Sequence, residues 1–62
     1  MLKMTLEQAE ELLKRTRNAK RKAYTEAWVK HAFKGAPEPE RGDLSYMAAQ
    51  GVQLEIGFPE NS

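Results

Sequence analysis

The chain has 62 residues, ten of them Lys or Arg and nine Asp or Glu, with a formal net charge of +1 and no cysteine. This length fits one small domain spanning residues 1–62. The absence of cysteine excludes disulfides. The single histidine, His31, has no neighbouring ligand pattern, so we predict no metal site. No run of 18 apolar residues occurs and acids interrupt the start, so we expect a soluble, cytoplasmic protein that does not bind a membrane.

A chain this short gains little net stability from its own core, because conformational entropy opposes most of what apolar burial returns. Disulfides and metals, the usual remedies, are not predicted here. We therefore expect self-association, most simply as a homodimer.

Residues 5–34 predict one continuous helix. Thr5 and Gln8 have the spacing of a capping box, and glutamates follow in the first turns, where they suit the helix dipole. No Gly or Pro occurs until Gly35, a typical C-terminal stop. Such a helix would be about 43 Å long, at about 1.5 Å per residue.

One side of this predicted helix is apolar, and its small Ala side chains at four-residue spacing would let a second helix approach closely. We expect the homodimer to form here, although the C-terminal part of the same chain could instead cover the stripe. The predicted interface residues are Leu6, Ala9, Leu12, Leu13, Ala19, Ala23 and Ala27.

The run KRTRNAKRK at residues 14–22 holds six of the ten basic residues and no acid, and all of these cations except Lys20 fall on the opposite side. Such a ridge can follow phosphates or enter a DNA major groove, where Arg reads guanine and Asn reads adenine. An acidic protein surface is the alternative partner, and a solvated face that only aids solubility explains the same pattern. The predicted binding residues are Lys14, Arg15, Arg17, Asn18, Arg21 and Lys22.

Aromatic residues gather towards the end of the predicted helix. Tyr24, Trp28, His31 and Phe33 could line a recognition pocket, but core packing explains them better. Because apolar residues change side in this region, we expect either a kink near Thr25 or, preferably, coverage of this end by the C-terminal segment.

Residues 35–42, GAPEPERG, predict a connector that reverses the chain. Residues 43–58 predict a β-hairpin, because apolar and polar residues alternate from Val52 to Ile56 and a loop at 49–51 would place apolar residues of both strands on one face. The competing interpretation is a short helix over 44–50, capped by Asp43 and stopped by Gly51. Residues 59–62 are expected to form a fraying tail, with Phe58 packed before it.

These patterns predict an α+β fold with a long N-terminal helix and a C-terminal hairpin. No motif indicates catalysis, so we predict a non-enzymatic binding protein without cofactor or small-molecule substrate, whose basic helix face contacts nucleic acid. The alternative is an adaptor or inhibitor that occupies a partner protein through the basic face or the hairpin edge, as small accessory proteins of phages and mobile elements do. Both modes assume a continuous helix.

Overall fold

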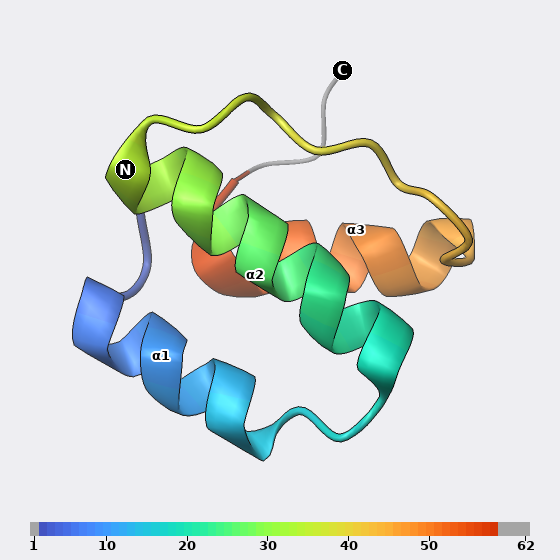
Figure 1. Cartoon of the computed structure of the whole chain (residues 1–62), viewed down its shortest axis with the longest axis horizontal. Helices are drawn as coiled ribbons and strands as arrows, with labels where there is room; N and C mark the ends of the chain where they lie inside the picture. Colours follow the sequence, from blue (N-terminus) through green and yellow to red (C-terminus); the bar gives the residue numbers. More distant parts are fainter. Residues whose placement is uncertain (1, 59–62) are drawn as a thin grey trace.

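The computed structural model describes residues 2–58, which form three α-helices and no strand. These are α1 (Leu6–Arg15), α2 (Ala19–Lys34) and α3 (Tyr46–Ile56). In Figure 1, α1 and α2 run in roughly opposite directions, and α3 lies behind them. The predicted α+β class is therefore wrong, because the described chain is entirely helical.

The predicted continuous helix over 5–34 is also wrong, because α1 ends at Arg15 and α2 begins at Ala19. Asn18, between them, bonds through its side chain to the backbone of α2, whereas the hydroxyl bond of Thr16 is of a kind that Thr25 also makes within α2. The Thr16 hydroxyl donates to the Leu12 carbonyl at 2.8 Å, and the Asn18 side-chain oxygen accepts from the Arg21 N–H at 2.9 Å. Asn18 thus caps α2, as Asn prefers to do.

The break buries the apolar stripe of α1 inside the chain. Ala9 of α1 packs with Tyr24, Trp28 and Val29 of α2, and all four are buried. A straight helix would leave its N-terminal half without a partner in the chain. Folding α1 back therefore replaces a predicted contact between two chains with one inside a single chain.

Residues 43–58 hold α3 rather than the predicted hairpin. Ser45 caps the helix, since its hydroxyl accepts from the Ala48 N–H at 3.2 Å. Ala49, Val52 and Ile56 follow at helical spacing and are all buried. An isolated two-stranded hairpin would have been only marginally stable, whereas this helix closes the core against α1 and α2.

The competing short helix over 44–50 gives the correct type of element but the wrong bounds. Ser45 rather than Asp43 is the cap, and α3 continues through Gly51. A β-carbon at Gly51 would lie 3.6 Å from Nη2 of Arg21 on α2, an ordinary van der Waals distance, so neither packing nor backbone conformation requires glycine there.

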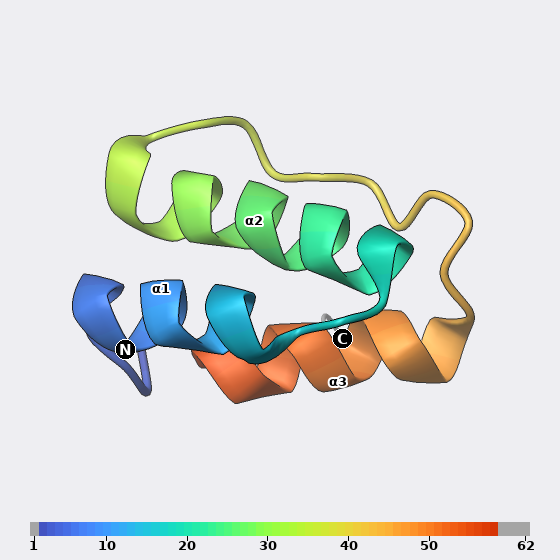
Figure 2. The same ribbon diagram turned by 60° about the horizontal axis from the view of Figure 1, so that its bottom comes forward.

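Several local predictions are confirmed. The Thr5 hydroxyl accepts from the Gln8 N–H at 3.2 Å, and the Gln8 side chain accepts from the Thr5 N–H at 2.9 Å, which completes the capping box. Gly35 ends α2 in the left-handed conformation, with φ of 74°. The connector then returns along α2, as Figures 1 and 2 show.

The aromatic cluster belongs to the core, as predicted. Tyr24 and Trp28 are buried, and His31 and Phe33 are half-buried. The ring centroid of Phe58 lies 4.6 Å from that of Trp28, so the C-terminal segment covers this end of α2. The predicted tail, 59–62, lies outside the described residues.

Both ends of the described chain meet at the C-terminus of α3. The Lys3 N–H donates to the Ile56 carbonyl at 3.0 Å, which carries the N-terminal segment across the end of this helix. Gly57 follows with φ of 120° and packs directly against the backbone of that segment. None of the three helices within 2–58 has the length and apolarity to cross a bilayer.

Candidate functional site

The predicted basic ridge is a corner in the structure, where the chain turns from α1 into α2. Lys14 and Arg15 lie in the last turn of α1, Arg17 lies in the connection, and three further cations lie in the first turn of α2. We call this set the basic corner. Its members are Lys14, Arg15, Arg17, Lys20, Arg21 and Lys22.

The N-terminus of α2 adds to the positive potential of the basic corner. No acidic residue occurs in its first turn, so nothing within the turn offsets the partial positive charge of the helix end. Lys14 and Arg15 stand at the opposite kind of helix end, where they complement the partial negative charge of α1. The cations that no helix C-terminus offsets are thus Arg17, Lys20, Arg21 and Lys22.

Two cations of the basic corner meet carboxylates of the same chain. The Lys20 Nζ lies 3.7 Å from an Asp43 carboxylate oxygen, in a pair whose side chains are 70% and 82% exposed. The Arg21 Nη2 lies 3.9 Å from a Glu55 carboxylate oxygen. Exposed pairs of this kind contribute at most about 1 kcal/mol. Their contribution to stability is therefore small, but each pair lowers the net positive charge of the basic corner.

Arg21 has a structural role as well. Its Nη1 donates to the Ala48 carbonyl at 3.4 Å while Nη2 faces Glu55, so the guanidinium bridges α2 and α3. It is half-buried, unlike the other five members of the basic corner. Lys14, Arg15, Arg17 and Lys22 are therefore the residues most available to an external anion.

Asn18 is placed differently from its predicted role in reading adenine. A bidentate contact with adenine needs both the oxygen and the nitrogen of the side-chain amide. The Asn18 oxygen already accepts from the Arg21 N–H as the cap of α2. If the Asn18 side chain bound adenine in this way, α2 would lose its N-terminal cap.

The predicted dimer residues do not form one surface. Ala9 and Leu12 are buried in the chain's own core, and Leu6 and Leu13 are half-buried against it. The alanines of α2 lie elsewhere: Ala19 and Ala23 are exposed and Ala27 is half-buried. Dimerisation itself stays a prediction, but its leucine half would require opening the core.

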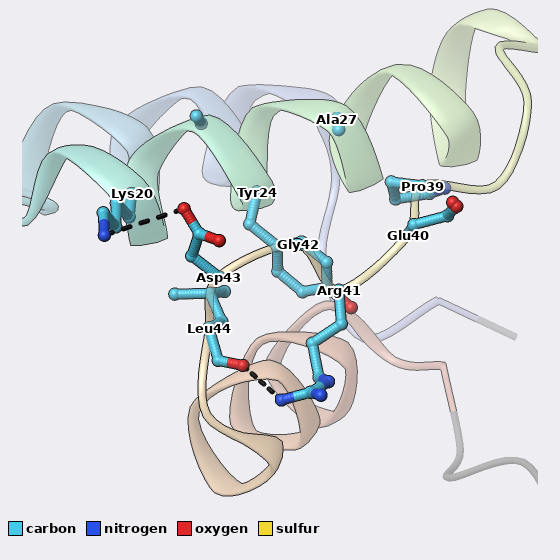
Figure 3. Close-up of a pocket in the computed structure, with 10 residues that line it drawn as sticks. Lys20, Tyr24, Ala27, Pro39, Glu40, Arg41, Gly42, Asp43 and Leu44 are labelled. Carbon is cyan, nitrogen blue, oxygen red and sulfur yellow. Dashed lines mark hydrogen bonds and ion pairs between the residues drawn. The ribbon is translucent and has the colours of Figure 1, made fainter.

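Ala23 and Ala27 line a groove that sequence reasoning missed. Figure 3 shows it between α2 and the connector, with Ala27 and Tyr24 on the helix side. Its volume is about 280 Å³, and its rim carries Lys20 and Asp43 as an ion pair. Arg41 on the same rim donates to the Leu44 carbonyl. These rim contacts are internal, and the groove offers no convergent polar groups that would select a ligand.

A second missed feature is the outer side of α3. Tyr46, Met47 and Leu54 are the large apolar side chains that stay exposed in the described part of the chain. The predicted hairpin concealed this surface, because in a strand Leu54 shares a face with Val52 and Ile56. The helical spacing of residues from Tyr46 onward is the sequence signal that distinguishes the exposed Leu54 from the buried Val52 and Ile56.

No cluster of three His, Asp or Glu side chains within 2–58 is arranged to hold a metal ion. Comparison of the chain with protein-family models, curated protein sequences and solved structures finds no match.

Proposed function

We propose that the protein is a non-enzymatic, cytoplasmic binding module whose basic corner contacts the phosphate backbone of nucleic acid. The observation that carries the proposal is the gathering of six cations within nine residues around one exposed turn, with no acid among them. Four of these cations have no carboxylate partner within the described chain. They are Lys14, Arg15, Arg17 and Lys22.

The continuous helix that both predicted modes assumed is broken between Arg15 and Ala19, so the proposed contact is not that of a helix lying along a groove. The cations come from a helix end, a connection and a helix start, so their charge is gathered around one turn of the chain. Phosphate contacts of this kind position a protein on nucleic acid but read no bases. With Asn18 occupied as a cap, we expect affinity with little dependence on base sequence.

Salt dependence measures how many phosphates are engaged. Each phosphate contact on duplex DNA contributes about −0.9 to the slope of log affinity against log salt concentration, so four contacts predict a slope of about −3.6. Fluorescence anisotropy with a labelled duplex, titrated between about 50 and 200 mM salt, gives this slope directly.

Charge reversal locates the contact. Arg17→Glu with Lys22→Glu should weaken binding and reduce the slope to about −1.8, because two of four phosphate contacts are lost. The matched control is Lys30→Glu with Lys34→Glu, two exposed lysines near the far end of α2 whose reversal changes the net charge equally. If both double variants weaken binding alike, only net charge matters and the basic corner is not the site.

An acidic protein surface is the second candidate partner, because carboxylates meet lysine and arginine by the same chemistry. Its support is the same set of unpaired cations, whereas the hairpin-edge mode has no basis in a described chain without strands. A complex captured through wild-type protein, lost with Arg17→Glu and resistant to nuclease, would favour this candidate. A nuclease-sensitive complex would favour nucleic acid.

A further inference from the structure

A tight turn at residues 41–44 holds the Asp43 carboxylate beside the basic corner. The Leu44 N–H donates to the Arg41 carbonyl at 3.4 Å, and the Arg41 guanidinium donates to the Leu44 carbonyl, so hydrogen bonds close the turn in both directions. In Figure 3 the Asp43 side chain points from this turn towards Lys20 on α2. The position of the carboxylate is therefore set by the turn as well as by the ion pair.

The two cations of the basic corner that meet carboxylates differ in how firmly they are held. Arg21 is half-buried and also donates to the Ala48 carbonyl, so loss of the Glu55 charge would not release it. The Lys20 side chain is 70% exposed, and its ion pair with Asp43 is the one that its Nζ makes within residues 2–58. Lys20 is therefore the cation that a change at a single carboxylate releases.

A phosphate that approached Lys20 would also meet the Asp43 carboxylate. Nζ and the carboxylate oxygen are 3.7 Å apart, so a phosphate in contact with Nζ would lie well within the Debye length, about 10 Å at 0.1 M salt, of that negative charge. Asp43 thus opposes the contact twice, because it occupies the ammonium group and repels the phosphate. The four exposed cations without a carboxylate partner in the described chain meet no such opposition.

We propose that Asp43 sets the edge of the phosphate contact on the basic corner, by keeping Lys20 out of it. This role rests on the proposed function, since it concerns the same surface. Nucleic acid is then directed to the part of the basic corner formed by the end of α1, the connection and Lys22, and the affinity is lower than it would be with Lys20 engaged. Asp43 is a positioning residue, because it contacts no phosphate itself.

Salt titration of binding to a labelled DNA duplex tests this role. Asp43→Asn should release Lys20 as a fifth phosphate contact, so the slope should steepen from about −3.6 to about −4.5. Binding at about 0.1 M salt should tighten by up to about fivefold, which corresponds to the loss of one exposed ion pair. Lys20→Gln alone should leave the slope near −3.6, and the double variant should return to that value, because the gain acts through Lys20.

Glu55→Gln is the matched control, because it removes the same charge beside another cation of the basic corner but leaves Arg21 bonded to the Ala48 carbonyl. Its slope should stay at about −3.6. An equal change of slope with Asp43→Asn and with Glu55→Gln would overturn the proposal, since only net charge would then matter. A slope of about −2.7 with Lys20→Gln would also overturn it, because Lys20 would already contact phosphate in the wild-type chain.

The same titrations separate failure of this role from failure of the proposed function. A wild-type chain that binds no duplex at about 50 mM salt would remove both. Wild-type binding that Arg17→Glu with Lys22→Glu weakens, but whose slope Asp43→Asn leaves unchanged, would remove only the role of Asp43. Helical circular dichroism checks that each variant is folded, and Asp43→Ser replaces Asp43→Asn if that variant is not.

Discussion

Replacing Gly57 by alanine should destabilise the fold severely, because the N-terminal segment lies where the new side chain would stand. A β-carbon on Gly57 would lie 2.5 Å from the Lys3 backbone nitrogen and 2.9 Å from the Leu2 Cα. Both neighbours are backbone atoms, which cannot turn aside as a flexible side chain can. Any movement of the N-terminal segment that relieved this overlap would strain the hydrogen bond from the Lys3 N–H to the Ile56 carbonyl.

The expected magnitude has two parts. The positive φ of 120° at Gly57 disfavours any residue with a β-carbon, by about 1–2 kcal/mol. Overlap with the N-terminal segment adds about 1–3 kcal/mol, as other overpacked sites do. The free energy of unfolding should therefore fall by about 2–5 kcal/mol, a large part of the stability of a small domain.

Gly42→Ala separates the two parts. Gly42 also has a positive φ, 65°, but no atom lies within 4 Å of its β-carbon position. Only the backbone cost of about 1–2 kcal/mol should appear there. Urea unfolding followed by circular dichroism at 222 nm gives both values, with trimethylamine N-oxide added if Gly57→Ala is unfolded in buffer. Equal losses in the two variants would show that the N-terminal segment does not lie against Gly57.

Three further predictions concern the helix break and the core, and urea unfolding measures each. Asn18→Ala should lower the free energy of unfolding by about 1 kcal/mol through loss of the α2 cap, while Asn18→Asp should retain most of it; equal losses would mean that the cap bond is not formed. Ile56→Ala should cost about 2–5 kcal/mol and Leu54→Ala under about 1.5 kcal/mol, whereas the hairpin predicts similar costs. A double-mutant cycle of Arg21→Ala and Glu55→Ala should give a coupling of about 0.2–1 kcal/mol, and zero coupling would mean that the two residues do not pair.

Sequence reasoning succeeds where the deciding residues are close neighbours in the chain. The capping box needs only Thr5 and Gln8, and the end of α2 needs only a glycine able to adopt a positive φ after Lys34. The aromatic core follows from the size of Tyr24 and Trp28. Each of these features is set within about one helical turn, so the pattern indicates it directly.

The helix break shows where local patterns stop deciding. Asn18 has the cap preference that marks a helix start, but the surrounding residues are strong helix formers and no Gly or Pro accompanies it. The choice depends on the apolar area that α1 buries by folding onto α2 and α3, which involves residues distant in the chain. The ion pair between Arg21 and Glu55 was not predicted for the same reason, because it joins residues distant in the chain.

The segment that forms α3 was predicted as a hairpin because the periodicity of a strand and that of a helix place most of the same apolar residues on the buried face. Val52 and Ile56 satisfy both an alternating strand and a helix with one buried face. The two interpretations differ in Leu54, which is buried in the strand and exposed in the helix, and in Ala49, which the helix buries. Whether Leu54 is covered depends on the other helices, so the local sequence does not determine it.

Five of the six residues of the basic corner were predicted as binding residues, but Lys20 was left out, Asn18 was included, and the shape was not predicted. The run from Lys14 to Lys22 is exposed, apart from the half-buried Thr16 and Arg21. The predicted straight ridge became a turn between two helices, and two of its cations acquired carboxylate neighbours. Phosphate contact is therefore expected from fewer residues, gathered over a shorter surface.

The most direct test of the central claim is a nuclear magnetic resonance titration of the labelled protein with a short DNA duplex. We expect the largest amide shift changes within residues 14–22, strongest around Arg17 and Lys22, with small changes along the outer side of α3. Changes concentrated on α3, or none at low salt, would contradict the claim that the basic corner is the surface that meets nucleic acid.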